Sequence, residues 1–75
     1  MLNHIKQEDE TILLEMASKI TDDIISQYEN QFFLIVDLPS GTMVVTGNIG
    51  TFFRELRDTP QAKIEELKAH QIAFK

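Results

Sequence analysis

The sequence predicts a single α+β domain over residues 1–75, in which a long amphipathic N-terminal helix packs on an antiparallel β-hairpin that a short and a longer helix follow. Apolar residues recur every three or four positions from Glu8 to Tyr28, which indicates the first helix. The residue pattern becomes that of a strand at Gln31, and Thr59-Pro60 is typical of a helix start. The expected order is therefore helix, strand, strand, helix, helix.

The first predicted helix carries one apolar stripe and an acidic first turn. Residues at helical spacing form the stripe: Leu13, Met16, Ala17, Ile20, Ile24 and Tyr28. Glu8, Asp9 and Glu10 lie in the first turn, where they complement the positive end of the helix dipole. Ile12, Leu14 and Ile25 widen the apolar arc, so this helix could contact two surfaces at once.

The predicted hairpin is apolar on both faces. Residues 31–38 and 42–46 form its strands, and Pro39-Ser40-Gly41 supplies the turn. A strand without alternating polar residues indicates that both of its faces are covered. Either the C-terminal helices cover the second face in a three-layer monomer, or two hairpins pair edge to edge in a homodimer. We favour the homodimer, because so short a chain builds only a small core.

The C-terminal part predicts two helices. Asn48, Gly50 and Thr51 form a loop with several possible helix caps, and a short helix then ends near Asp58. The last helix is expected from Pro60 to about Ala73, and one stripe along it consists of Ile64, Leu67, Gln71 and Phe74.

The composition excludes several classes of protein. The 75 residues contain no cysteine, so disulfide scaffolds, zinc ribbons and thiol redox sites are excluded. No apolar run is long enough for a membrane span, and the N-terminus does not resemble a signal peptide, so we expect a cytoplasmic protein without a membrane partner. A net charge of −5 also disfavours a nucleic-acid partner.

The acidic charge is concentrated in the N-terminal part. Residues 1–30 carry a net charge of −5, whereas residues 48–75 carry +1. One interpretation of this asymmetry is an acidic helix that binds a basic surface of a partner protein. An ordinary solvated helix face is the commoner origin of such a pattern. The candidate residues are Glu8, Asp9, Glu15, Asp22 and Asp23.

No catalytic constellation is evident. The loop from Gly47 to Thr51 lacks the spacing and the lysine of a phosphate-binding loop, which favours a plain strand-to-helix turn. His4 and His70 lie at opposite ends of the chain, and the serines have no evident base. We therefore expect no enzyme activity, no catalytic residue, no cofactor and no metal site.

The remaining hypothesis is a non-enzymatic protein-interaction module, a homodimeric regulator or inhibitor that binds a larger protein. Its expected apolar interface consists of Phe32, Phe33, Ile35, Phe52 and Phe53. Adjacent helical residues diverge by about 100°, so one of the last two rings should be partly exposed unless a dimer core buries both. The alternatives are a structural self-assembling subunit and, third, nucleic-acid binding through C-terminal basic residues, namely Arg54, Arg57, Lys63 and Lys68.

Overall fold

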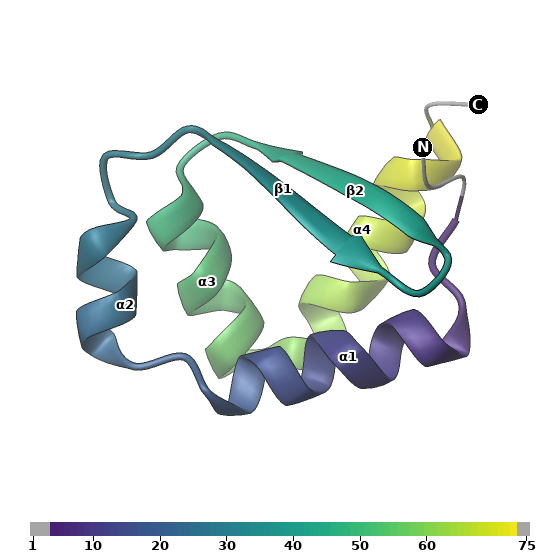
Figure 1. Ribbon diagram of the computed structural model, residues 1–75, viewed down its shortest axis with the longest axis horizontal. Helices are drawn as coiled ribbons and strands as arrows, with labels where there is room; N and C mark the ends of the chain where they lie inside the picture. Colours follow the sequence, from purple (N-terminus) through teal and green to yellow (C-terminus); the bar gives the residue numbers. More distant parts are fainter. Residues whose placement is uncertain (1–3, 74–75) are drawn as a thin grey trace.

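The computed structural model describes residues 4–73, and it arranges them in two layers. Within this range the elements follow the order α1 (Gln7–Ser18), α2 (Asp22–Gln27), β1 (Phe33–Leu38), β2 (Gly41–Thr46), α3 (Ile49–Asp58) and α4 (Pro60–Ala73). The helices lie together on one side of the hairpin (Figure 1). The predicted α+β class and the order from the hairpin onward are thus confirmed.

The N-terminal helix is shorter than the sequence predicts, because α1 ends at Ser18 and a second helix follows. Thr21 is the N-cap residue of α2, and its hydroxyl oxygen accepts a hydrogen bond from the backbone N–H of Ile24 at 3.2 Å. Two aspartates follow this cap in the first turn of α2, where the helix dipole favours them. The prediction of one helix to Tyr28 is therefore wrong, although the apolar stripe still faces the core from both helices.

The hairpin forms as predicted, with the register running from Phe33 opposite Thr46 to Leu38 opposite Gly41. Pro39 and Ser40 make the two-residue turn. The inner face of the hairpin packs on the helices through Leu34, Val36, Leu38, Met43 and Val45. No described segment covers the outer face, because α3 and α4 lie on the same side as α1 (Figure 1). The three-layer monomer, the less favoured of the two predicted arrangements, is therefore wrong for the described residues.

Helix α3 lies at the centre of the helix layer and contacts α1, α2 and α4. Phe52 and Phe53 are 4% and 7% exposed, so both rings are buried within one chain. The Phe53 ring packs edge to face on Tyr28, with 5.0 Å between the ring centroids. A helix with neighbours on several sides buries an arc wider than the angle between adjacent residues. The expectation that one of these rings is partly exposed is therefore wrong.

The loop before α3 is a tight strand-to-helix turn, as the sequence predicts. Asn48 caps α3, since its side-chain oxygen accepts from the N–H of Thr51 at 3.0 Å. The N–H of Gly50 donates to the carbonyl of Tyr28 at 3.0 Å. A Cβ at position 50 would lie 3.0 Å from the Glu29 Cα, so only glycine allows α3 to approach this segment so closely.

Candidate protein-interaction surface

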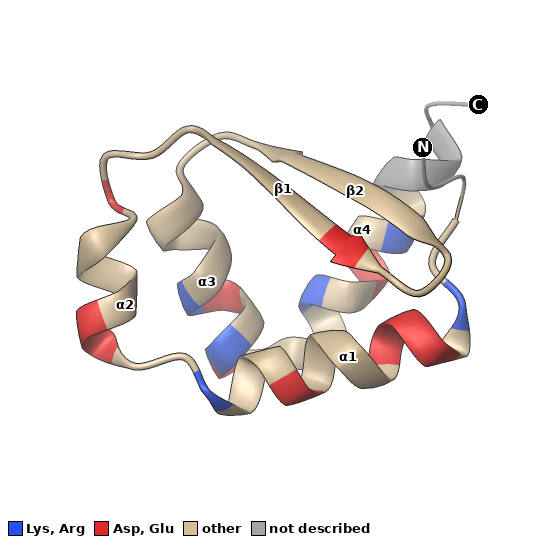
Figure 2. Cartoon of the chain, in the orientation of Figure 1, with Lys and Arg blue, Asp and Glu red and all other residues tan. Residues whose placement is uncertain are grey.

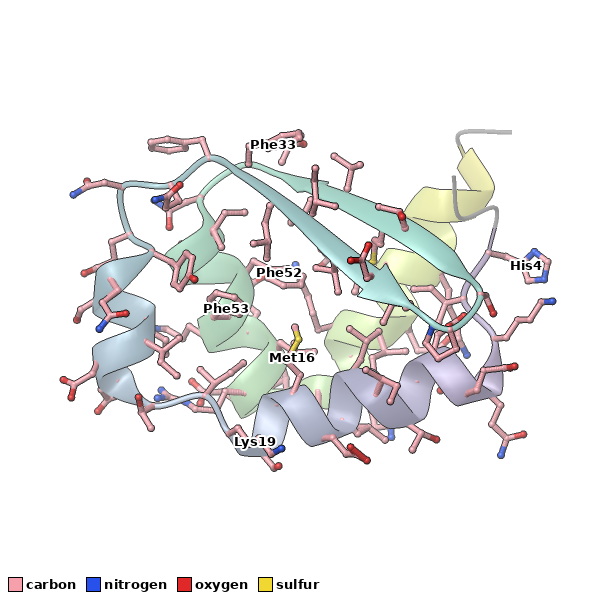
Figure 3. All side chains as sticks on the ribbon, viewed as in Figure 1. His4, Met16, Lys19, Phe33, Phe52 and Phe53 are labelled. Atoms are coloured by element: carbon pink, nitrogen blue, oxygen red, sulfur yellow. The ribbon has the colours of Figure 1, made fainter. Side chains whose placement is uncertain are left out.

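The outer hairpin face is the most exposed apolar region among the described residues. We use this name for Phe32 and the side chains of β1 and β2 that point away from the helices. Phe33 and Ile35 are each 55% exposed, and Val44 is 37% exposed. Phe32, directly before β1, is 63% exposed. Figure 3 shows Phe33 pointing away from the helix layer, on which Phe52 and Phe53 lie.

The strand register explains why these side chains point outward. Ile35 lies opposite Val44, and Phe33 lies opposite Thr46, so the four side chains share one face of the pleat. The intervening residues supply the inner face, which the helices cover. A shift of the register by one residue would exchange the two faces. The buried inner face and the two-residue turn therefore fix which apolar residues remain in water.

Both edges of the hairpin are open. Leu38 and Gly41 flank a two-residue turn, which makes them a hydrogen-bonded pair. Along each strand the backbone groups of alternate residues then point away from the other strand, as at Ile35 in β1 and at Val44 in β2. Among the described residues, no hydrogen bond reaches these outward groups. The outer hairpin face is thus bordered by unpaired strand edges, which can pair with another chain.

The outer hairpin face is nearly free of charge. Asp37 is the one charged residue of the two strands, and it lies near the turn (Figure 2). Its carboxylate accepts a hydrogen bond from the hydroxyl of Thr42 at 3.4 Å. The other coloured residues in Figure 2 lie on the helices and their connections. The described part of the molecule therefore has an apolar side with one charged residue, Asp37, and a charged helical side.

Asp9 is not part of an exposed acidic surface, because its side chain is fully buried. Its two carboxylate oxygens accept hydrogen bonds from the backbone N–H groups of Lys6 at 2.8 Å and Ser40 at 3.0 Å. Burial raises the pKa of Asp9, but these hydrogen bonds outweigh it and leave the pKa below its usual value. Asp9 therefore attaches the hairpin turn to the start of α1, and its prediction as a partner-binding residue is wrong.

The other predicted acidic residues are divided between two helices. Glu8 and Glu15 are exposed on α1, whereas Asp22 and Asp23 are exposed on α2, a separate helix. Asp22 also forms an ion pair with Arg57 at 2.5 Å, which connects α2 to α3. The hydrogen bond from this guanidinium is the main cause that lowers the pKa of Asp22.

The basic residues of the C-terminal helices are mostly held in ion pairs. Arg57 also contacts Asp58, its neighbour in α3, at 2.9 Å. The Lys68 ammonium lies 2.7 Å from Glu10 of α1. Three of the four basic residues considered for nucleic-acid binding thus have carboxylate partners within the chain: Arg57, Lys63 and Lys68.

A groove of about 290 Å³ lies between β2, α3 and α4. The Lys63 ammonium lies in it, 2.9 Å from Glu55, 2.8 Å from Glu66 and 5.4 Å from the centre of the Phe52 ring. Burial lowers the pKa of Lys63, but the two carboxylates outweigh this effect and raise it. The three charged side chains that line the groove are thus paired with one another, so it offers no unpaired charge.

The remaining candidate residues are dispersed. His4 is exposed near the N-terminus (Figure 3), and the side chain of His70 lies outside the described residues. Among the described side chains, no three histidine or acidic residues gather as metal ligands would. No described helix is both long and apolar enough to cross a membrane.

Sequence reasoning includes Phe32, Phe33 and Ile35 in the apolar interface but misses Val44. The signal that could have found Val44 is its position opposite Ile35, which follows once a two-residue turn fixes the register. Comparisons with protein-family models, with curated proteins and with solved structures each gave no match to this chain. The geometry of the outer hairpin face is therefore the basis for a functional proposal.

Proposed function

We propose that this chain is a non-enzymatic protein-binding module that makes its contacts through the outer hairpin face. The single observation that carries the proposal is the exposure of two adjacent phenylalanine rings and of Ile35 on a surface whose one charged side chain, Asp37, lies at the turn end. Exposed apolar patches with a polar rim mark sites of protein interaction. Aromatic side chains at the centre of such a patch supply much of the binding energy.

The position of the patch supports a binding role over a purely structural one. Phe33 and Ile35 do not contribute to the core, so burial within the monomer does not explain their side chains. Burial of one such side chain on binding contributes about 1.5–3 kcal/mol when it is complete. The open strand edges beside the patch add backbone donors and acceptors for the same partner.

The acidic side of the molecule has a secondary part in this proposal. The exposed carboxylates of α1 and α2 lie on the helix layer, away from the outer hairpin face (Figure 2). Such charges can increase the rate of encounter with a basic partner without forming the contact. We propose a cytoplasmic regulator or inhibitor with this arrangement, because its folding requires no disulfide.

A matched pair of variants tests the proposal. Ile35→Lys places a charge in the outer hairpin face, whereas Ile12→Lys makes the same change on α1, where Ile12 is 38% exposed. In affinity capture from an extract of the source organism, we expect the wild type and Ile12→Lys to retain the same partner. Ile35→Lys should lose it. Equal retention by both variants would contradict the proposed surface.

A further inference from the structure

We propose that the outer hairpin face binds a second copy of this chain, so that two hairpins stack face to face in a symmetric dimer. This inference rests on the proposed function and names the partner of the same surface. The dimer would pair each outer hairpin face with its own equivalent, as an interface with two-fold symmetry requires. The two helix layers would then lie on opposite outer sides of the dimer.

The charge distribution favours a second copy in this orientation. Two copies with a net charge of −5 each repel one another wherever their acidic helices approach. Stacked sheets lie about 10 Å apart, and the helix layers lie beyond them, so the acidic residues would be separated by more than the Debye length of about 8 Å. The outer hairpin face is thus the side on which two copies can meet without bringing those residues together.

The edge-to-edge dimer that the sequence suggests lacks this separation of the helix layers. Pairing of two β2 edges would place both helix layers on one side of a four-stranded sheet. It would also leave Phe33 and Ile35 in water. Face-to-face stacking covers these side chains and also keeps the two helix layers apart, which edge-to-edge pairing does not.

Asp37 determines the direction of the two-fold axis. This carboxylate lies at the turn end of the face, and Phe33 lies at the opposite end of β1. An axis parallel to the strands would place Asp37 opposite its own equivalent. A two-fold axis that lies in the plane of the interface and runs across the strands places the two carboxylates at opposite ends of the interface. The second arrangement sets Ile35 and Val44 at the centre, against their equivalents in the partner.

The exposed area predicts a weak dimer. Four apolar side chains, Phe32, Phe33, Ile35 and Val44, expose on the order of 400 Å² per copy. Two copies therefore bury on the order of 800 Å² through these side chains alone. The neighbouring threonines and strand backbones extend this area toward the roughly 1,200 Å² at which specific interfaces begin. We expect a dissociation constant on the order of 10–100 µM.

Sedimentation equilibrium between 5 µM and 1 mM tests the inference with the same variants. We expect the wild type and Ile12→Lys to change from 8.6 kDa to twice that mass with the same dissociation constant. Ile35→Lys should weaken association by at least tenfold. Circular dichroism at 5 µM checks that each variant keeps its helical content, and Phe33→Ser is the second test variant if Ile35→Lys does not fold.

Two results would overturn the inference. One is a wild type that remains a monomer at 1 mM. The other is a dimer that Ile35→Lys and Phe33→Ser leave unchanged, since the contact would then lie elsewhere. The failure of this inference is distinguishable from that of the proposed function. A monomeric wild type that captures a different protein through Ile35 would contradict the dimer but retain the proposed function. A wild type that neither dimerises nor captures a protein through Ile35 would contradict both the dimer and the proposed function.

Discussion

The two faces of the hairpin are built from similar side chains but lie in opposite environments. On the inner face, Met43 and Val45 are 1% and 8% exposed. On the outer face, Ile35 and Val44 are 55% and 37% exposed. The difference shows that apolarity alone does not make a core residue, because the helices of one chain cover one face only. The inner face stabilises the fold, and we propose that the outer face binds a partner.

Among the substitutions that test this comparison, truncation of an inner-face side chain should lower the free energy of unfolding most. We expect Met43→Ala to lower the free energy of unfolding by about 2–4 kcal/mol, because it removes buried methylenes and leaves a cavity. Urea denaturation at 5 µM measures this change. The outer-face control, Ile35→Ala, should change the free energy of unfolding by less than about 1 kcal/mol. Similar losses for the two variants would contradict the assignment of the faces.

Replacement of the buried Asp9 carboxylate, which binds the hairpin turn, should cause the next largest loss of stability. We expect Asp9→Asn to destabilise the fold by about 1.5–3 kcal/mol, because one of two backbone N–H groups would face an amide donor. Asp23→Asn, at an exposed first-turn position of α2, is the matched control. Urea denaturation at pH 7 compares the two variants, and equal losses would show that the hydrogen bonds of Asp9 do not matter.

The pH dependence of stability tests the same carboxylate. The pKa of folded Asp9 lies below the usual value of 3.8, so its contribution is present above that pH. It is lost as the pH falls through the folded pKa. We therefore expect the wild-type advantage over Asp9→Asn to shrink below about pH 4. An advantage that stays constant between pH 6 and pH 3 would contradict this account.

Adjacent valines allow the two faces to be compared by one substitution. Val45→Thr places a hydroxyl on the inner face, and we expect it to destabilise the fold by about 1–2 kcal/mol. Val44→Thr makes the same change on the outer face and should lie within about 0.5 kcal/mol of the wild type. Thermal and urea denaturation check both values. Reversal of this order would indicate a different strand register.

Removal of the exposed ion pair between α2 and α3 should change the stability least. Asp22→Asn removes the contact with Arg57, but the aspartate side chain is 91% exposed and solvent screens the interaction. We expect a small decrease of the denaturation midpoint at low salt that disappears in 1 M NaCl. A loss that persists at high salt would show that this pair has a structural part beyond its charge.

Much of the fold could be predicted from local patterns in the sequence. The stripe from Leu13 to Tyr28, the hairpin turn and the helix start at Pro60 each depend on neighbouring residues. The helix break could also have been found, because Thr21 precedes two aspartates. The pattern of apolar spacing continues across this break and obscures the cap.

The candidate site depended on tertiary packing, which local patterns do not contain. Both faces of β1 are apolar, so the sequence did not reveal which face the helices cover. Asp9 resembles an ordinary first-turn acid, and its burial follows from the approach of Ser40, 31 residues away along the chain. Phe52 and Phe53 were expected at an interface because the central position of α3 is not a property of its own sequence.

The most direct test of the central claim is solvent accessibility of the valine and isoleucine methyl groups, measured by NMR with a soluble nitroxide. At 5 µM, we expect strong relaxation at Ile35 and Val44 and protection at Val36 and Val45. At 1 mM, Ile35 and Val44 should also become protected. Protection of Ile35 in the dilute monomer, or its full accessibility at 1 mM in a dimer, would contradict the account.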